Sequence, residues 1–504
     1  MPKLNTRERS NMGMSIVIAI VLSLSLSLTL YVFKVKKEQN RVRQLLASYL
    51  IEIQEEIDAL SFDNYLQKSW LYENFIDEVL EIYHQDKKVL KLLSLEKTPD
   101  IFMIIKETEL WLKEINSVYI EKELELYKEY FNKIERNPLS EKQRLAVIVN
   151  EKNNLILAGA GSGKTSVIVA KVGYVLKKGY ASKKEILLLA FNKKAQKELA
   201  ERIEEKWGLV EVKTFHAFGK KVVEKASNNS CSDFSAMITD ATKAINNGSY
   251  ISPYRYIFID EFQDISEERN ELILALKKQK LDVNVTVVGD DWQSINSFSG
   301  SDIDIIQNFE SIYGDTATIK LDYTFRFNDT LAKVSQNFIL KNSLQIYKEI
   351  KSIKPIDNNS LYLYEYKDKQ KMDEYIENIL DFISKNIKEE KSLLILSRYS
   401  FYKPKNMSLY INKYKELSIV FETVHGSKGL EADYVILTHM ESGKFGFPSE
   451  QSAVDLNDYP YAEERRLFYV AMTRAKEKLF FLSSKEKPSS FMEEILREHE
   501  FIHL

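Results

Sequence analysis

A glycine-rich loop at residues 158–165 has the residue types that bind nucleotide phosphates. Its residues are Ala158, Gly159, Ala160, Gly161, Ser162, Gly163, Lys164 and Thr165. The loop follows an apolar run at 155–157 and opens a helix-like stretch, so backbone N–H groups and a helix N-terminus would face the phosphates. Lys164 would then reach the β- and γ-phosphates, and the Thr165 hydroxyl would hold Mg²⁺. We therefore predict a site for ATP and Mg²⁺.

A pair of carboxylates, Asp260 and Glu261, follows the apolar run 256–259. Asp260 suits the coordination of Mg²⁺ through a water molecule. Glu261 suits a general base that orients and deprotonates an attacking water. A strand that ends in these carboxylates can lie beside the phosphate loop in one parallel sheet. Together, the two motifs predict a nucleoside triphosphatase.

Short apolar runs recur from about residue 136 onward and alternate with charged, helix-like stretches. They lie at 155–157, 186–189, 256–259 and 285–288, and again at 393–396, 434–437 and 479–482. Nearly continuous apolar strands are typical of a parallel sheet that is covered on both faces. We expect an α/β fold with two tandem domains, 136–317 and 318–504, that meet near residue 318.

Seven further motifs follow in a fixed order along this part of the chain. They are LSEKQR (139–144), FNKKA (191–195), TFHAF (214–218), VGDDWQSI (288–295), FRF (325–327), TVHGSKGLE (423–431) and ERRLFYVAMTRA (464–475). Together with the phosphate loop and the carboxylate pair, they resemble the superfamily 1 helicases of the UvrD/Rep type. Within that group the resemblance is strongest to the helicase IV branch. It covers the chain from about residue 136 to residue 504 and implies two RecA-like P-loop domains.

The resemblance implies which residues surround the nucleoside of ATP. Gln143 would read the adenine edge, Phe325 would stack on the adenine, and Glu431 would contact the ribose. Ser166 follows the phosphate loop at a position where many family members carry an arginine that packs on the adenine. We include Ser166 among the nucleotide-binding candidates and note this departure from the family pattern.

The γ-phosphate needs positive charge on several sides when it is transferred. By resemblance Gln293 senses the γ-phosphate, and Arg326 and Arg474 contact it. Lys164 belongs to the first predicted domain, whereas the two arginines lie in the second or at its border. We therefore expect ATP in a cleft that is completed when the domains close, which would couple hydrolysis to motion.

Four residues are candidates for binding single-stranded nucleic acid. Phe191, His216 and Phe298 suit base stacking and hydrogen bonding, and His425 of the 423–431 motif joins them by resemblance. An alternative interpretation of Phe191 and Phe298 is that they are ordinary core residues.

Two intervals are short in comparison with the family. Residues 214–257 and 328–422 leave little room for the insert subdomains of related helicases. The motifs that bind and hydrolyse ATP are complete, but the segments that bind and separate a duplex in related helicases are shorter here. We expect an ATP-dependent translocase or helicase on single-stranded DNA, or on duplex with a single-stranded tail, that moves 3′ to 5′ by resemblance. The alternatives are an ATP-dependent nucleic-acid-binding switch that unwinds nothing, and an RNA-directed helicase.

The N-terminal segment predicts a membrane anchor. Residues 15–33 carry no charge, and as a helix they would span roughly 28 Å, close to the thickness of a hydrocarbon core. We expect a tail at 1–13, a transmembrane helix at 14–33 and a helical region at 34–135. Basic residues are richer after the segment than before it, which predicts a single-pass protein with its motor on the cytoplasmic side. The alternating residues 23–28 are also compatible with a strand.

An apolar stripe follows the predicted anchor. Its members are Leu46, Leu50, Ile53, Ile57 and Leu60, which share one face of a helix. The stripe predicts either a bundle that packs on its own chain or self-association through residues 46–60.

Composition excludes several other classes of protein. The chain has 71 Lys and Arg against 74 Asp and Glu, a net charge of −3, so bulk charge alone does not hold nucleic acid. Cys231 is the single cysteine, which excludes a disulfide scaffold or a cysteine-based metal cluster.

Overall fold

A computed structural model describes residues 37, 65–68, 99–227, 236–451 and 459–504. The chain divides into two compact units, Met1–Tyr119 and Ile120–Leu504. The predicted span at 15–33, the stripe at 46–60 and Cys231 lie outside the described residues. The motor motifs all lie in the second unit.

The predicted localisation, a single-pass membrane protein, is corrected by the structure. Among the residues that the structure describes, no helix is both long and apolar enough to cross a bilayer. The helix α4 (Pro99–Leu126) has 28 residues, but charged residues such as Lys113, Glu114 and Lys122 recur along it. We do not retain the membrane anchor.

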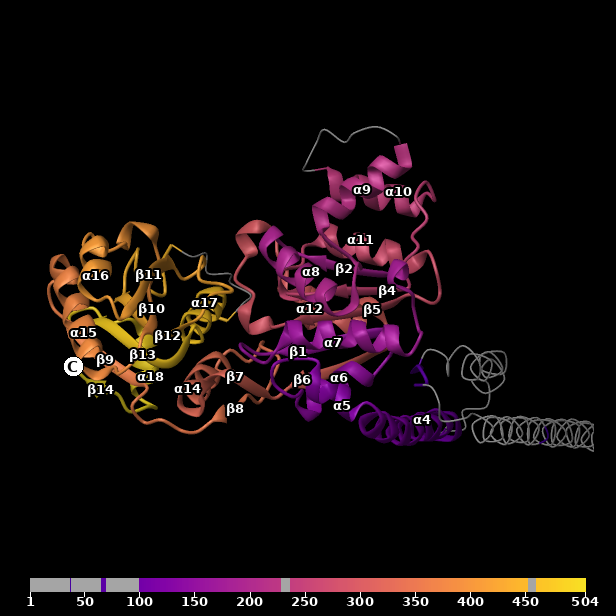
Figure 1. Ribbon diagram of the computed structural model, residues 1–504, viewed down its shortest axis with the longest axis horizontal. Coiled ribbons are helices and arrows are strands. Elements are labelled where there is room, and N and C mark those ends of the chain that lie inside the picture. The colour runs from indigo at the N-terminus through magenta and orange to yellow at the C-terminus, as the bar shows by residue number, and fades with distance from the viewer. Residues whose placement is uncertain (1–36, 38–64, 69–98, 228–235, 452–458) are drawn as a thin grey trace, which may run out of the picture. The chain divides into compact units, whose positions relative to one another are not determined.

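The first half of the second unit is built on a six-stranded sheet with the order β3-β2-β4-β5-β1-β6 (Figure 1). All neighbouring strands in it are parallel. The strands are β1 (Asn153–Ala158), β2 (Ile186–Ala190), β3 (Glu211–Thr214), β4 (Tyr256–Ile259), β5 (Asn284–Gly289) and β6 (Thr316–Leu321). Every residue of β1, β2, β4 and β5 is buried, as a sheet covered on both faces requires.

Helices connect these strands and cover the sheet. They are α5 (Lys128–Lys133), α6 (Glu141–Ile148), α7 (Lys164–Lys177), α8 (Lys193–Trp207), α9 (Phe215–Ser227), α10 (Met237–Asn246), α11 (Glu267–Lys278), α12 (Ile303–Gln307) and α13 (Phe309–Tyr313). Short 3₁₀ turns follow the carboxyl ends of two strands: η3 (Phe262–Asp264) after β4, and η4 (Asp291–Gln293) with η5 (Ser297–Ser299) after β5.

The second half contains another six-stranded parallel sheet, in the order β11-β10-β12-β13-β9-β14. Its strands are β9 (Leu361–Tyr366), β10 (Lys391–Ser397), β11 (Leu417–Thr423), β12 (Ala432–Met440), β13 (Ala475–Ser484) and β14 (Ile502–His503). Its helices are α14 (Asp329–Ile339), α15 (Met372–Asn386), α16 (Met407–Lys413), α17 (Ala462–Met472) and α18 (Ser490–Leu496). The predicted α/β class with parallel sheets is confirmed.

A small parallel pair, β7 (Tyr323–Asn328) with β8 (Lys351–Lys354), lies between the two sheets in the chain. The strand β6 pairs with β1 in the first sheet, so the predicted boundary at residue 318 falls inside a strand of that sheet. The division of the chain into domains stays a prediction.

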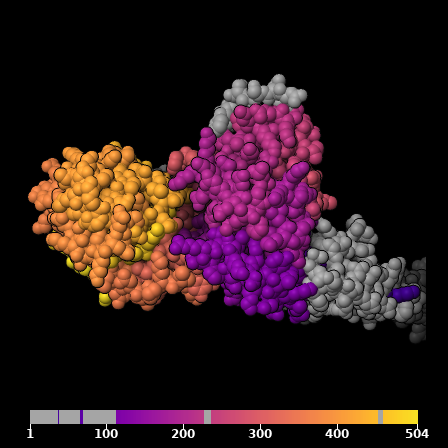
Figure 2. Space-filling model, viewed as in Figure 1, coloured from indigo at the N-terminus to yellow at the C-terminus, as the bar shows by residue number. Residues whose placement is uncertain are grey.

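The two halves of the unit share a buried core. Trp292, which follows β5, is fully buried and packs edge-on against Tyr469 of α17, with ring centroids 5.4 Å apart. Both residues belong to one apolar cluster with Phe338 of α14 and Leu467 of α17. Figure 2 shows the magenta and purple surface of the first half meeting the orange and yellow surface of the second. This contact brings the motifs of both halves to one interface.

Candidate nucleotide site and strand-binding surface

The phosphate loop links β1 to α7 and bounds a cavity of about 330 Å³. Gly161 and Gly163 adopt the left-handed conformation, with φ of 73° and 79°, which glycine adopts at little cost. A Cβ on Gly161 would lie 2.5 Å from Cβ of Arg326, so the loop approaches the second half closely. The other residues around the cavity are Ser166, Arg202, Glu261, Gln293, Phe325, Arg326, Lys428, Gly429, Glu431 and Arg474.

Lys164, Thr165 and Glu261 line this cavity, and the buried Asp260 contacts Thr165. Lys164 Nζ lies 3.7 Å from Glu261 Oε2. The Thr165 hydroxyl donates to Asp260 Oδ2 at 3.2 Å. A hydroxyl and a carboxylate oxygen held together are ligands that Mg²⁺ prefers, and an ammonium with a glycine-rich loop suits phosphates. The residues present therefore fit both ATP and Mg²⁺.

The two carboxylates differ in the directions of their pKa shifts. Burial raises the pKa of Asp260, and the neighbouring Glu261 carboxylate raises it further. Burial also acts to raise the pKa of Glu261, but the Lys164 and Lys428 ammonium groups outweigh it and lower that pKa. Glu261 therefore stays ionised, as a general base must.

The backbone at Glu261 is in a conformation that side-chain-bearing residues rarely adopt. Its φ is 53°, in the left-handed region. Gln263 fixes the side chain, because its Nε2 donates to Glu261 Oε2 at 2.6 Å while its Oε1 accepts from the Asp290 N–H at 2.9 Å. The surrounding structure thus holds a strained residue in place, as is common at functional sites.

The two predicted arginines approach the cavity from the second half. Arg474 is buried, and its Nη2 donates to Gln293 Oε1 at 3.3 Å. Burial and the neighbouring Arg326 lower the pKa of Arg474 to about 9. Arg326 Nε donates to Glu431 Oε2 at 2.7 Å. Both guanidinium groups are thus held by polar partners, and both arginines line the same cavity as Lys164.

Two predicted nucleotide-binding residues, Gln143 and Ser166, have side chains with hydrogen-bond partners within the protein. Gln143 does not line the cavity; its Oε1 accepts from the Ser140 N–H in a capping box, and its Nε2 donates to the Ser162 carbonyl at 2.8 Å. It therefore ties α6 to the phosphate loop. Ala158 is buried at the end of β1. Ser166 lines the cavity and donates to Glu135 Oε2 at 3.3 Å.

Arg202 is a cavity residue that sequence reasoning missed. It comes from α8, its Nη2 lies 2.7 Å from Glu135 Oε2, and the same nitrogen donates to the Ser166 hydroxyl at 3.2 Å. An arginine thus reaches the place where Ser166 departs from the family pattern. The FNKKA motif lies nearby on the same helix, but no local pattern singles out Arg202.

Lys348 is a second residue that the sequence did not reveal. Its Nζ lies 2.5 Å from oxygens of both Asp290 and Asp291, and all three side chains are fully buried. Asp290 Oδ2 also accepts from Gln293 Nε2 at 2.6 Å. Two adjacent buried carboxylates require a cation, but the sequence does not indicate which lysine supplies it.

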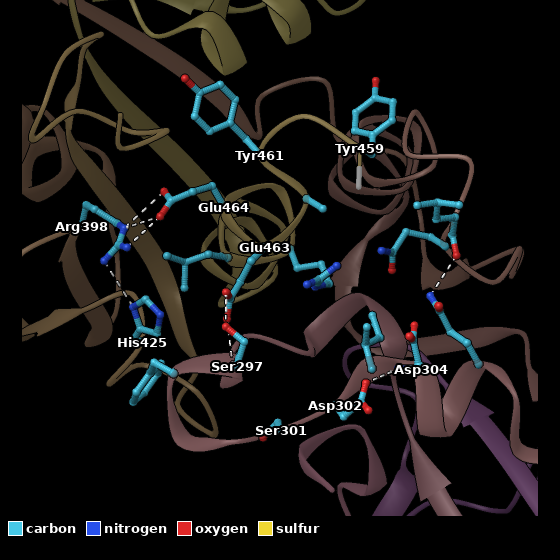
Figure 3. Close-up of a pocket in the computed structure, with 18 residues that line it drawn as sticks. Ser297, Ser301, Asp302, Asp304, Arg398, His425, Tyr459, Tyr461, Glu463 and Glu464 are labelled. Atoms are coloured by element: carbon cyan, nitrogen blue, oxygen red, sulfur yellow. Dashed lines mark hydrogen bonds and ion pairs between the residues drawn. The ribbon is translucent and has the colours of Figure 1, made fainter. Parts of the chain in front are cut away.

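A second cavity, of about 890 Å³, lies between η5 and the TVHGSKGLE segment (Figure 3). Phe298 is 77% exposed at its rim, and its ring lies edge-on to His425 with centroids 5.7 Å apart. Arg398 extends from the end of β10 toward His425 and contacts Glu464 through two nitrogens (Figure 3). An exposed aromatic ring beside a histidine and an arginine is suited to a stacked base.

Phe191 and His216 do not line this second cavity. Phe191 packs against Phe215 with centroids 5.1 Å apart, and the Arg269 guanidinium lies over its ring. Burial lowers the pKa of His216, and Arg269 adds to the shift. These two candidates thus lie outside the lining of the second cavity, and their role in strand binding stays a prediction.

Comparison with known proteins agrees with the arrangement of motifs. The AAA domain family matches residues 143–299. DNA helicase IV of Escherichia coli strain K12 is 30% identical over an alignment 522 positions long, which covers 77% of this chain and 75% of that protein. The chain belongs to the UvrD/Rep-type superfamily 1 DNA helicases. As a member of this family, the helicase is an ATP-hydrolysing enzyme.

Two further relatives, which align with a shorter part of the chain, are also helicases by name. A probable DNA helicase II homolog from Mycoplasma capricolum is 26% identical over 41% of this chain and 42% of its own length. The ATP-dependent DNA helicase PcrA of Staphylococcus aureus is 23% identical over 41% of this chain and 40% of its own length. Each of these alignments covers less than half of the helicase described here.

Proposed function

We propose that the helicase translocates along single-stranded DNA in the 3′-to-5′ direction and uses ATP to do so. The supporting observation is the short segment that follows β5. It carries Gln293 in the wall of the nucleotide cavity and Phe298, five positions later, at the rim of the second cavity. A change in the contacts of Gln293 is therefore transmitted over one short turn to a ring that can stack on a base.

The nucleotide cavity has the groups that hydrolysis requires. Lys164 and the phosphate loop would bind and orient the phosphates, while Thr165 and Asp260 would hold Mg²⁺, which would supply charge neutralisation at the phosphates. Glu261 accepts the proton of the attacking water. Arg326 and Arg474 turn from Glu431 and Gln293 toward the γ-phosphate and stabilise its charge in the transition state.

Contacts across the interface link the cavity to movement of the two halves. Lys428 Nζ lies 2.7 Å from Asp264, Arg466 Nε donates to the Ser294 carbonyl at 2.5 Å, and the Ser297 N–H donates to Glu463 at 3.1 Å. These polar contacts can break and form again as the halves open and close. We infer that each round of hydrolysis moves the Phe298–His425 pair along the strand by this route.

A nucleic-acid-dependent switch without unwinding activity is the alternative. Between β3 and β4 the described chain forms only α9 and α10, and between β10 and β11 it forms only η7 (Ser400–Tyr402) and α16. Such short connections leave little structure to split a duplex. Such a switch would hydrolyse ATP when bound to a single strand but would displace no complementary strand.

The deciding experiment measures ATP hydrolysis and strand displacement with the same protein. We expect single-stranded DNA to stimulate the ATPase more than RNA does, and duplexes with a 3′ tail to be unwound in preference to those with a 5′ tail. Stimulation without displacement would favour the switch. No stimulation by any nucleic acid would contradict both.

A further inference from the structure

A file of aromatic rings continues from the Phe298–His425 pair across the second sheet. His425 follows β11, Arg398 and Tyr399 follow β10, and Phe445 follows β12, which are three neighbouring strands of one parallel sheet. Because parallel strands end at the same edge, these side chains gather along the carboxyl edge of the sheet. Three of them contribute a ring and Arg398 contributes a planar guanidinium.

Neighbouring members of this file are in contact. Arg398 Nη1 lies 3.5 Å from His425 Nδ1, and its guanidinium lies 4.8 Å from the ring centre of Tyr399. Tyr399 stacks on Phe401 with centroids 5.1 Å apart and planes 14° apart. Phe401 then meets Phe445 edge-on at 5.4 Å. From Phe298 to Phe445, therefore, each ring or guanidinium touches the next.

The far end of the file is exposed but rigidly held. Phe401 is 61% exposed and Phe445 41% exposed. Their neighbours are fixed, since the Tyr402 hydroxyl donates to the Phe445 carbonyl at 3.2 Å and the Tyr402 ring stacks on His439 at 3.7 Å. A single exposed phenylalanine needs no explanation, but two exposed rings on an ordered base form a platform.

Lysine side chains lie around this platform. Lys444 Nζ lies 5.4 Å from the Phe445 ring centre, and Lys369 Nζ, which is paired with Glu441, lies 4.9 Å from the Tyr402 ring centre. Lys403, Lys405 and Lys444 are exposed, and within the described ranges none of them is in an ion pair. Aromatic faces with unpaired lysines beside them match the bases and phosphates of a single strand.

We propose that Phe401 and Phe445 form a second stacking site for single-stranded DNA, which extends the path that begins at Phe298 and His425. The site rests on the proposed function, because it takes the same strand. It lies on η7 and on the loop after β12, next to the short connection from β10 to β11. Bases that leave the first site would pack on these rings, with Lys403, Lys405 and Lys444 near the phosphates.

The test measures binding of oligodeoxythymidines of increasing length to the full chain by fluorescence anisotropy. Wild-type affinity should rise when the oligonucleotide is lengthened at one end. Phe401→Ala with Phe445→Ala should remove this gain, by about five-fold or more for each base that loses its stacking partner. The shortest oligonucleotide should bind as in wild type. Phe401→Tyr with Phe445→Tyr should restore the gain, because the ring faces return.

Controls separate this site from the proposed function and from protein stability. Leu281→Ala changes a side chain that is 86% exposed before the amino end of β5, and it should alter neither affinity nor basal ATPase. If wild type binds no oligonucleotide and Phe298→Ala has no effect, the proposed function fails. If Phe298→Ala weakens binding but the Phe401/Phe445 double variant binds every length as wild type does, the second site is wrong. An equal loss at all lengths would also overturn it.

Discussion

Lys348 Nζ and a carboxylate oxygen of Asp290 lie 2.5 Å apart, and both side chains are completely buried. The same ammonium lies 4.4 Å from the ring centre of Trp292. Through Asp290 it holds Gln293, whose amide oxygen accepts from Arg474. A lysine from the segment between α14 and β8 therefore fixes a glutamine in the nucleotide cavity, and this link has measurable consequences.

We predict that Lys348→Met impairs turnover beyond its effect on stability. It leaves Asp290 and Asp291 buried without a cation, which should destabilise the fold by about 3–5 kcal/mol. In the protein that remains folded, kcat should fall while the KM for ATP changes little, because Gln293 loses its orientation. Thermal unfolding and steady-state ATPase assays provide both measurements.

A matched control is Lys171→Met. Lys171 is also fully buried, but its ammonium donates to the carbonyls of Ala146, Val147 and Val149, and among the described residues it pairs with no carboxylate. This variant should lose stability without a selective loss of kcat. Equal effects on kcat in both variants would show that Lys348 acts only through the fold.

The carboxylate pair gives a second prediction. Glu261→Gln should keep ATP binding but lower turnover by about 10²-fold or more, since a positioned base contributes that much. Lys164→Ala should weaken both binding and turnover. Nucleotide binding measured by calorimetry, alongside turnover, distinguishes the two variants. Normal turnover in Glu261→Gln would remove Glu261 from the mechanism.

Arg202 gives a third prediction, which concerns the base of the nucleotide. Its guanidinium lies beside Ser166 in the cavity that also contains Phe325, so it can pack on one face of the adenine. Arg202→Ala should raise the KM for ATP several-fold and leave the weak competition by inorganic triphosphate unchanged, because triphosphate has no base. Adding Ser166→Arg to this variant should restore the KM. Equal weakening of ATP and triphosphate would place Arg202 at the phosphates instead.

The sequence predicted best those features that depend on contiguous residues. The phosphate loop, Glu261 after β4 and the arginines of the later motifs belong to local strings, and these residues line one cavity. Lys348 and Arg202 could not be found in this way. They meet their partners across 58 and 36 residues of chain, and nothing in the neighbouring sequence marks them.

Other features could not be predicted because a residue pattern is compatible with more than one packing arrangement. The sequence leaves open whether Phe191 stacks on a base or packs in the core; its half-buried ring packs against Phe215 and lies under Arg269, and its role in binding a strand stays a prediction. The apolar residues of β6 are compatible with either sheet, and the parallel register with β1 assigns the strand to the first. The file of rings from Arg398 to Phe445 joins the ends of separate strands, so it becomes visible only once the strand order is known.

The raised pKa of Asp260 gives the last prediction, which concerns pH. Burial and the adjacent Glu261 charge raise this pKa above its ordinary value of 3.8, so the free helicase holds this proton at a higher pH than the unfolded chain does. The free energy of unfolding of the free protein should therefore fall as the pH rises from the ordinary pKa of this carboxyl group to its raised pKa. Binding of Mg²⁺ with ATP requires the carboxylate and must release the proton. The increase in Tm caused by Mg²⁺ and ATP should consequently grow between about pH 5 and about pH 8.

Asp260→Asn isolates this effect, because ATP itself also titrates and does so equally in both proteins. The pH dependence of the ligand-induced Tm shift should be weaker in Asp260→Asn than in wild type. In Glu261→Gln the transition should move to lower pH, since the neighbouring negative charge that helps to raise the pKa is gone. If wild type and Asp260→Asn show the same pH dependence, Asp260 does not exchange its proton for the metal, and Thr165 must hold Mg²⁺ without it.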